Sequence, residues 1–316
     1  MSGADGFLAR VIAVHEAAQG VKAFVIAADD GAALPAWAPG AHVDLALTET
    51  LSRQYSLCGD PTDRTHLRCA VLRDAHSRGG SRLMHDAVAA GDTLRVIGVR
   101  NAFPIVAATH YLLIAGGIGV TPLLAMAQEL ERQGKPWQML YGGRSRASMA
   151  FLSELAVYGA KVLIRPEDEF GLLDLAGFLG TTEPGKVAYC CGPEPLIKAV
   201  ERHCAAWPED LLQIERFRPK VTTVVGIDPP FEVELRQSGV TVTVPTGESI
   251  ADTLDAIGIH IPRSCNEGTC GTCLTRVIEG LPDHRDSFLR PKQHAKNDRM
   301  LVCCSRSLTP RLVLDA

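Results

Sequence analysis

The stretch Cys265-Asn266-Glu267-Gly268-Thr269-Cys270-Gly271-Thr272-Cys273 places three cysteines in a C-x4-C-x2-C pattern, and Cys303 and Cys304 stand far downstream. Spacing of this kind, completed by a distant cysteine, is typical of plant-type [2Fe–2S] ligands. Several thiolates on one loop are unfavourable without a cation, because like charges repel and each thiolate must lose its water. The stretch therefore predicts a metal centre that prefers sulfur ligands.

Two glycines inside this loop favour an iron–sulfur cluster over its alternative, a structural zinc site. Gly268 and Gly271 allow the backbone to curl around an inorganic core and to direct N–H groups at sulfur. Zinc sites prefer paired C-x2-C knuckles separated by a shorter finger, whereas this chain has one C-x2-C preceded by a C-x4 step. We therefore expect Cys265, Cys270 and Cys273 to bind a [2Fe–2S] cluster.

The fourth ligand is expected to be one of two adjacent cysteines, Cys303 and Cys304. If this segment is extended, the two side chains point to opposite faces and only one of them reaches the cluster. The spacing alone does not say which.

Length and composition limit the function classes. The chain has 316 residues, which favours two or three domains, and its 46% hydrophobic and 22% charged residues are typical of a soluble globular protein. A net charge of -4 and the lack of a long basic run with interleaved aromatics argue against nucleic-acid binding. No apolar run is long enough to span a bilayer, and residues 1–20 lack the features of a secretory signal. We expect a cytoplasmic protein with no membrane partner, and cysteines outside the metal pattern that stay reduced.

Residues 1–105 predict a small antiparallel β-barrel, because short β-rich runs alternate with turns. The expected strands are Leu8–Val14, Val21–Ala27, His42–Leu47, Leu67–Leu72 and Thr93–Ile97, with one helix over Ser81–Ala90.

Two motifs in this barrel together fit a flavin site. Arg53 and Tyr55 lie on one face of an extended segment, where they offer a guanidinium for phosphate and an aromatic ring. Gly79 and Gly80, followed by Ser81 at a helix start, offer backbone N–H groups to an anion. Taken singly, each motif is also compatible with solvated surface or an ordinary turn.

Residues 106–225 predict a doubly wound α/β domain. The apolar run Tyr111–Ala115 suits a buried parallel strand, and it is followed by Gly116–Pro122 and a helix over Leu123–Gln133. Thr121 is expected as the N-cap, with Pro122 in the first turn. A glycine turn between a strand and a helix suits a pyrophosphate, although the G-x-G-x-x-G fingerprint is absent. Further strands are expected at Trp137–Tyr141, Val162–Arg165 and Val187–Cys191, with helices over Met149–Val157 and Pro195–Trp207.

Ligands of such a fold bind at the carboxyl ends of the strands, where Gly116, Gly142-Gly143-Arg144 and Cys191-Gly192-Pro193 fall. Cys191 is then either a packed core thiol or a neighbour of the cofactor. Arg144 and Arg146 either contact ribose or phosphate or belong to the surface.

Residues 218–230 carry proline at both ends and predict an inter-domain connector. After it, a hairpin of Phe231–Arg236 and Val240–Val244, a helix over Ser249–Ile257, the cysteine loop and strands Leu274–Ile278 and Arg311–Leu314 suggest a β-grasp domain of ferredoxin type.

With these features in place, the whole chain resembles the phthalate dioxygenase reductase family, which includes vanillate demethylase reductases. The resemblance implies an FMN-binding barrel (1–105), an NAD-binding domain (106–225) and a ferredoxin domain (226–316). By that resemblance FMN contacts Arg53, Tyr55, Ser56, Gly80 and Ser81, while the nicotinamide cofactor contacts Gly117, Gly119, Thr121, Cys191 and Gly192.

The resemblance also addresses the connector and the fourth ligand. Glu215-Arg216-Phe217 is similar to the family segment that leads towards the flavin, which makes Phe217 a candidate flavin contact. Cys303-Cys304-Ser305-Arg306 matches the family's Cys-x-Ser-Arg pattern, with Cys303 as ligand and Cys304 as a packed thiol.

These features suggest a converter of electron pairs into single electrons. A hydride from NADH carries two electrons, whereas a [2Fe–2S] centre takes one at a time. A flavin between them is able to accept the pair and to release the electrons singly. The resemblance implies NADH, and as acceptor a Rieske-type oxygenase acting on an aromatic compound or a quaternary amine, with a cytochrome P450 as the alternative acceptor. The sequence leaves the oligomeric state open, and we expect a monomer. Two other readings are a zinc-bound scaffold and a flavin reductase whose cluster is only structural. NADPH, the oxygenase and its substrate are left open by the sequence.

Overall fold

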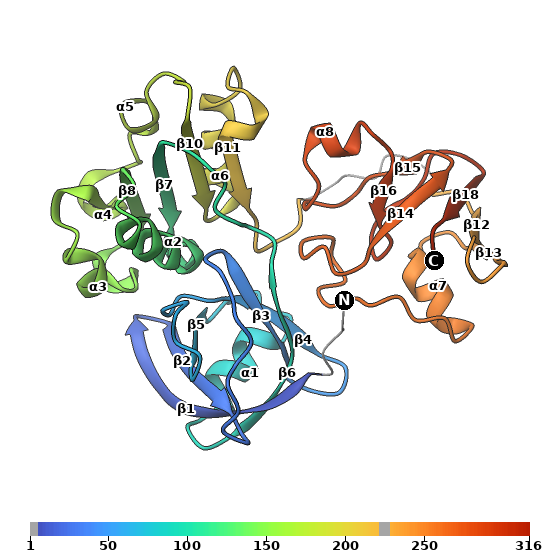
Figure 1. Ribbon diagram of the computed structural model, residues 1–316, viewed down its shortest axis with the longest axis horizontal. Coiled ribbons are helices and arrows are strands. Elements are labelled where there is room, and N and C mark those ends of the chain that lie inside the picture. The colour runs from blue at the N-terminus through green and yellow to red at the C-terminus, as the bar shows by residue number, and fades with distance from the viewer. Residues whose placement is uncertain (1–5, 221–227) are drawn as a thin grey trace. The chain divides into compact units, whose positions relative to one another are not determined.

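The computed structural model describes residues 6–220 and 228–316, and the chain divides into two compact units, unit 1 (1–215) and unit 2 (216–316). Figure 1 shows a barrel and a parallel sheet in unit 1 and a smaller mixed sheet in unit 2. The three-domain boundaries predicted above stay a prediction. Among the described residues, no helix combines the length and hydropathy needed to cross a bilayer.

The first sheet of unit 1 is the predicted antiparallel barrel. Its six strands run in the order β4-β3-β6-β1-β2-β5. A bridge between Leu57 and Cys69 joins the end of β4 to β5 and closes the sheet. Alternating buried and exposed positions in β1 and β6 explain why these segments form half-buried strands. The elements are β1 (Phe7–Ala18), β2 (Val21–Ala28), β3 (Ala41–Ala46), β4 (Ser52–Ser56), β5 (Leu67–Leu72), α1 (Gly80–Asp86) and β6 (Thr93–Asn101).

The second sheet of unit 1 is parallel, with strand order β11-β10-β7-β8-β9. The chain moves from β7 outward to β9 and then returns to β10, so the topological switch point lies between β7 and β10. The elements are β7 (His110–Gly116), α2 (Val120–Arg132), β8 (Trp137–Gly143), α3 (Leu152–Ala156), β9 (Val162–Pro166), α4 (Glu167–Phe170), α5 (Leu175–Leu179), β10 (Lys186–Cys191), α6 (Glu194–His203) and β11 (Leu212–Glu215).

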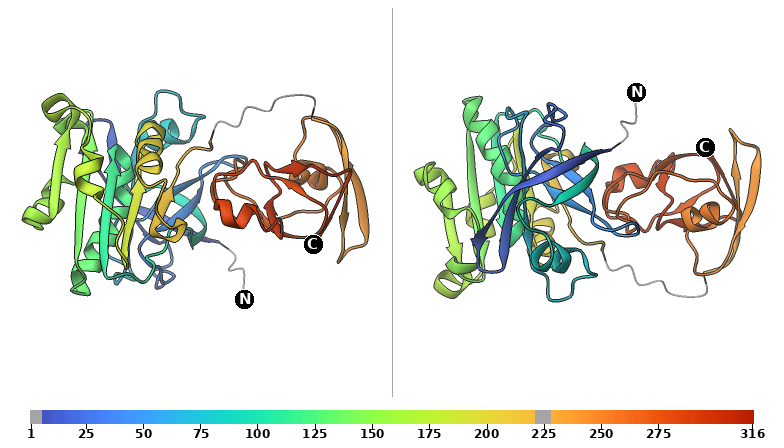
Figure 2. Two further views of the ribbon diagram at one scale, coloured as in Figure 1. Left: turned by 90° about the horizontal axis from the view of Figure 1, so that it is seen from above. Right: turned by 90° about the horizontal axis from the view of Figure 1, so that it is seen from below.

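Helices cover both faces of this sheet. Leu113 on β7 packs in a core with α2, whereas Leu112 and Ile114 pack in a second core with α5 and α6. Burial on both faces explains why β7 reads as a continuous apolar run. Figure 2 gives two further views of these layers. The predicted doubly wound α/β architecture is confirmed.

Several helix boundaries differ from the sequence prediction. The helices expected over Met149–Val157 and Pro195–Trp207 are α3 (Leu152–Ala156) and α6 (Glu194–His203). The helix expected over Ser81–Ala90 ends at Asp86, and the backbone N–H of Ala89 donates to the carboxylate of Asp92 at 2.8 Å instead of continuing the helix. Thr121 is not the N-cap of α2, because a short 3-10 turn runs directly into the helix and Gly119 takes that position. The Thr121 hydroxyl donates to the carbonyl of Ile118 at 2.9 Å.

The barrel and the parallel sheet share one core within unit 1. Val21, Ala23 and Phe103 of the barrel belong to the same buried cluster as α2. At the edge of this contact, Arg68 on β5 donates two hydrogen bonds to Glu154 on α3, at 2.9 and 2.8 Å. The Arg68 guanidinium also donates to the carbonyl of Cys58 at 2.6 Å.

We expect Arg68→Met to lower the free energy of unfolding of unit 1 by about 1–3 kcal/mol. It removes three hydrogen bonds donated by a charged guanidinium, two of them to a carboxylate, although Glu154 still reaches solvent and is not left fully desolvated. Thermal unfolding followed by circular dichroism measures the change. The matched control is Arg132→Met. Arg132 pairs with Glu129 one turn away on the surface of α2, and loss of this pair should lower the free energy of unfolding by less than about 0.5 kcal/mol. Equal shifts in the two variants would contradict a bridging role for Arg68.

Unit 2 forms the predicted β-grasp arrangement, with sheet order β13-β12-β18-β14-β16. β12 pairs in parallel with β18, while the other pairs are antiparallel, and α7 packs on the sheet through Ile250 and Leu254. The predicted connector 218–230 lies partly outside the described residues. The elements are β12 (Phe231–Leu235), β13 (Val240–Val244), α7 (Ile250–Ala256), β14 (Leu274–Glu279), β15 (Pro282–Asp283), α8 (Pro291–His294), β16 (Arg299–Leu301), β17 (Arg306–Ser307) and β18 (Arg311–Leu314).

Candidate functional site

The cysteine loop of unit 2 directs backbone N–H groups at sulfur. Glu267 and Thr269 each donate to the sulfur of Cys265 at 3.4 Å, and Thr272 donates to the sulfur of Cys270 at 3.5 Å. Such bonds stabilise a thiolate and tune a cluster bound to it.

Both glycines of this loop have backbone conformations that favour glycine. Gly268 has φ +69° and Gly271 has φ +78°, and a Cβ on Gly271 would lie 2.4 Å from the ring of Phe288. The sequence-based expectation that these two positions require glycine agrees with this geometry.

The structure brings Cys265, Cys270, Cys273 and Cys303 together. Contact with Cys303 is the main cause that lowers the pKa of Cys273, against burial and the negative charges of Cys270 and Cys265. Four thiols gathered on one loop and the turn beside it fit a two-iron cluster.

Cys303 and Cys304 lie in a turn after β16, so the alternation of an extended strand does not separate them. The Cys304 sulfur contacts the carbonyl of Leu301 and the hydroxyl of Ser305, both at 3.8 Å. Contact with Cys303 and burial raise the pKa of Cys304, which favours a neutral thiol there. These contacts support Cys303 as the fourth ligand.

The predicted flavin residues of the barrel also lie together. The side chain of Arg53 on β4 packs directly against Gly80 at the start of α1. A Cβ on Gly80 would lie only 2.5 Å from the Arg53 side chain. The buried hydroxyl of Tyr55 makes no hydrogen bond within the described part of the chain. Burial raises the pKa of this phenol, so it stays protonated and is able to donate to a ligand. Ser81 lies at the same turn, where its hydroxyl accepts the N–H of Asp74 at 3.2 Å.

The ends of β7 and β10 meet at the switch point of the parallel sheet. A Cβ on Gly119 would lie 2.3 Å from the carbonyl oxygen of Cys191, and one on Gly192 would lie 3.0 Å from Cα of Gly116. These backbones are thus in direct contact, whereas Gly117, with φ +52°, has open space above it. The predicted nicotinamide-cofactor residues Gly117, Gly119, Cys191 and Gly192 therefore lie together where β7 and β10 end, and Thr121 nearby is buried.

Glu215 links the flavin and nicotinamide candidates. The Cys191 thiol donates to the Glu215 carboxyl group at 3.8 Å, and Ser56 of the barrel also hydrogen-bonds that group. Burial raises the pKa of Glu215 to about 8. Sequence reasoning treated Glu215 only as part of a family segment. Its position at the carboxyl end of a strand next to that of Cys191 is the signal that identifies it.

Three further predicted or considered residues lie at exposed positions. Arg144 is exposed after β8, and Arg146 pairs with Glu169 at 2.8 Å on the surface. Phe217 belongs to unit 2, and its side chain is 43% exposed. Their predicted cofactor contacts stay predictions.

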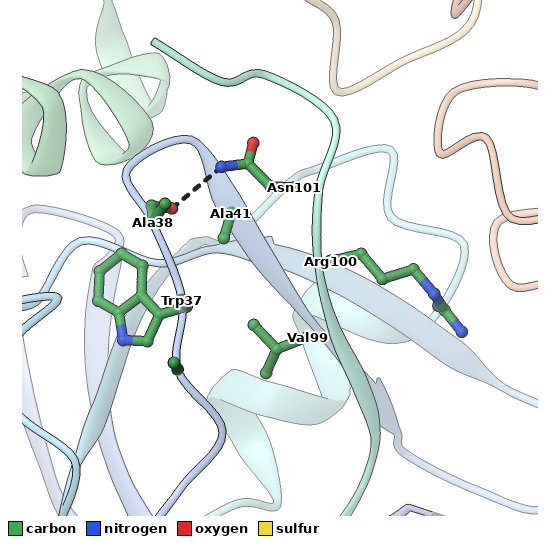
Figure 3. Close-up of a pocket in the computed structure, with 7 residues that line it drawn as sticks. Trp37, Ala38, Ala41, Val99, Arg100 and Asn101 are labelled. Atoms are coloured by element: carbon green, nitrogen blue, oxygen red, sulfur yellow. Dashed lines mark hydrogen bonds between the residues drawn. The ribbon is translucent and has the colours of Figure 1, made fainter. Parts of the chain in front are cut away.

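A separate hollow of about 370 Å³ opens on the barrel and contains none of the predicted flavin residues. Figure 3 shows the Arg100 side chain pointing away from Trp37, and Arg100 pairs with Asp44. Asn101 closes one side through a hydrogen bond to the carbonyl of Ala38 at 3.2 Å.

Comparison with known proteins agrees with this geometry. A family model described as a 2Fe-2S iron-sulfur cluster binding domain matches residues 233–308. Phenoxybenzoate dioxygenase subunit beta of Ectopseudomonas oleovorans is 39% identical over 308 residues, which are 97% of this chain and 96% of that protein. The solved structure of phthalate dioxygenase reductase, described as a modular structure for electron transfer from pyridine nucleotides to [2Fe–2S], is 32% identical with a TM-score of 0.72, and 98% of each chain is covered.

The chain belongs to the phthalate dioxygenase reductase family. This reductase is thus an oxidoreductase whose cofactors are FMN, a [2Fe–2S] cluster and NADH. A solved self-sufficient cytochrome P450 monooxygenase is also similar, at 40% identity and a TM-score of 0.90, and the match covers 98% of this chain but 41% of that one.

The residues present fit these cofactors. The unpaired hydroxyl of Tyr55 and the Arg53 guanidinium offer donors for a flavin, and the sulfur-directed N–H groups suit a cluster held by four cysteines.

The titration of Glu215 gives a pH prediction. In the unfolded chain the pKa of Glu is near 4.3, and folding raises it to about 8, so the folded state binds the proton more tightly. The contribution of Glu215 to the free energy of unfolding is therefore largest at low pH. It falls by on the order of 1–3 kcal/mol as pH rises from about 5 to 8. In Glu215→Gln the corresponding loss should be absent. Thermal unfolding of both proteins at pH 5.5, 7 and 8.5 measures the difference, and a difference that does not change with pH would contradict the assignment.

The two adjacent cysteines give a second prediction. Cys303→Ala should lose the cluster, because a cluster held by three thiolates lacks one iron ligand, whereas Cys304→Ala should retain it. Iron per chain and visible absorption are the measurements. The opposite outcome would assign the fourth ligand to Cys304.

Proposed function

We propose that the reductase accepts a hydride from NADH in unit 1 and passes single electrons through the cluster of unit 2 to a Rieske-type non-haem iron oxygenase. The observation that carries this proposal is the contact of Glu215 with both Ser56 and Cys191. Hydride transfer requires direct contact of the nicotinamide and the flavin. A side chain that touches candidates for both sites supports such a contact.

The residues at this junction bind and orient the reactants. Bound FMN would supply the step from an electron pair to single electrons. The backbones of Gly119 and Cys191 are in direct contact, and Gly117 has open space above it, so that a flat ring is able to approach the backbone at Gly117. A neutral Glu215 holds its proton at the carboxyl group and avoids placing a negative charge beside an incoming hydride. No catalytic acid or base is required by this chemistry.

The relatives support an oxygenase as acceptor. Phenoxybenzoate dioxygenase subunit beta is, by its name, one subunit of a dioxygenase, and the match covers nearly all of it. We infer an acceptor of the same class, a separate oxygenase component acting on an aromatic compound or a related small molecule. The similar self-sufficient cytochrome P450 supports a P450 as the second candidate acceptor. A cytoplasmic location and a monomeric state belong to this proposal as predictions.

An anaerobic NADH titration tests the electron chain. In the wild type the flavin and cluster absorption should bleach together. Cys273→Ser should keep bleaching of the flavin by NADH but lose electron delivery to the acceptor by at least about tenfold, since the cluster is the exit from the flavin.

Cys304→Ala is the matched control and should keep both activities. Full activity of folded Cys273→Ser towards the acceptor would make the cluster only structural, and a colourless, zinc-containing wild type would contradict the reductase function. Parallel assays with a Rieske-type oxygenase and a P450 distinguish the two acceptors.

A further inference from the structure

A group of metal-binding side chains lies in unit 2 outside the four cysteines. His284, Asp286 and His294 each offer one donor atom, and these atoms all lie within 4.8 Å of one another. His284 and Asp286 follow strand β15, and His294 is the last residue of helix α8. Two imidazoles and one carboxylate form a ligand set that divalent transition metals prefer.

The two carboxylate oxygens of Asp286 make different contacts. The side chain is fully buried, and Oδ2 accepts the N–H groups of Phe288 and Leu289 at 3.1 and 2.6 Å. Oδ1 faces the histidines, with Nε2 of His294 at 3.0 Å and Nδ1 of His284 at 3.8 Å. One oxygen is thus fixed by the backbone, while the other points at both imidazoles.

His284 is the member of the group whose buried ring nitrogens lack good hydrogen bonds within the described residues. Its side chain is 9% exposed, and neither ring nitrogen completes a hydrogen bond of normal geometry within the described residues, although Asn297 and the backbone of His294 lie near it. Leaving a buried polar group without a partner costs about 1–3 kcal/mol. Burial, and secondly the proximity of His294, lower the pKa of His284, so its ring is neutral at pH 7 and a lone pair is available.

Arg285, the neighbour of Asp286 in sequence, pairs with other carboxylates. Arg285 donates to Asp228 at 2.9 and 2.6 Å and to Asp283 at 2.7 Å. Asp286 therefore supplies one negative charge beside two imidazoles, which suits a cation.

We propose that His284, Asp286 and His294 bind one Zn²⁺ ion, with water as the fourth ligand. Zinc takes nitrogen and oxygen ligands at about 2.0–2.2 Å in a tetrahedral arrangement. The two imidazole rings now lie stacked, with centroids 4.3 Å apart and an angle of 22° between them. On binding, the three donor atoms shift to face the ion, which replaces the hydrogen bond between His294 and Asp286.

This site is separate from the four cysteines but contacts their loop. The N–H of Ser287 donates to the carbonyl of Gly268 at 2.9 Å, and a Cβ on Gly268 would lie 2.9 Å from Cα of Asp286. Zinc bound here would stiffen the segment that supports the cluster loop.

Metal analysis of the holoprotein tests the proposal. Protein that contains its cluster is incubated with one equivalent of ZnCl₂ and desalted, and zinc and iron are measured by mass spectrometry. The wild type should retain about one zinc per chain, and His294→Asn should lose at least about tenfold in zinc affinity. Asn at this position still offers a hydrogen bond to Asp286, which preserves the fold. His260→Asn is the matched control, because His260 is an exposed histidine that also pairs with an aspartate, Asp255, at 2.8 Å.

X-ray absorption at the zinc edge identifies the ligands. Nitrogen and oxygen neighbours near 2.0–2.1 Å without sulfur support the site, whereas sulfur neighbours near 2.3 Å would place zinc at the cysteines and overturn it. Loss of zinc equal in His294→Asn and His260→Asn, or no zinc retained by the wild type, also overturns it. The iron content reports separately on the cluster, so failure of the zinc site leaves the electron chain unaffected. If His294→Asn fails to fold, absorption by the wild type decides the question.

Discussion

The hydrogen-bonded contact of Glu215 with Ser56 and Cys191 is the interaction on which the proposed hydride transfer in unit 1 depends. Ser56 ends strand β4 of the barrel, while Cys191 and Glu215 end adjacent strands of the parallel sheet. These groups meet because the two sheets share a core and because Arg68 bridges to Glu154 beside it. Burial then raises the pKa of the Glu215 carboxyl group and favours its neutral form at the proposed cofactor site.

In unit 2 the candidate metal ligands lie on loops, and the sheet supports these loops. The cysteine loop contains almost no regular structure, and its glycines are held by the segment that follows β15. Asp286 packs at Gly268 and Phe288 packs at Gly271, so the loop cannot accept larger side chains there. A rigid support of this kind positions N–H groups at sulfur, and it also brings His284 and His294 to the carboxylate of Asp286.

The strands were predictable because their signals are local. Leu67–Leu72, Val240–Val244 and Arg311–Leu314 form at the predicted residues, since alternation or a continuous apolar run reports burial directly. Helix ends were less predictable. Thr121 has the residue type of an N-cap, but a preceding 3-10 turn shifts the start of α2, and Asp92 ends the helix that was expected to reach Ala90. In both cases a neighbouring segment competes for the same backbone groups.

The sequence by itself determined the chemical type of the metal centre and the order along the chain of the barrel, the parallel sheet and the ferredoxin-type sheet. Cysteine spacing and hydrophobic periodicity are properties of short segments, so they can be interpreted without knowledge of the packing. Only the tertiary structure decided that Glu215 joins Ser56 and Cys191, that the Cys304 thiol turns to Leu301, and that His284, Asp286 and His294 converge. These contacts join side chains through turns and sheet pairings whose geometry is set by the packed core, so residue type and spacing alone could not specify them.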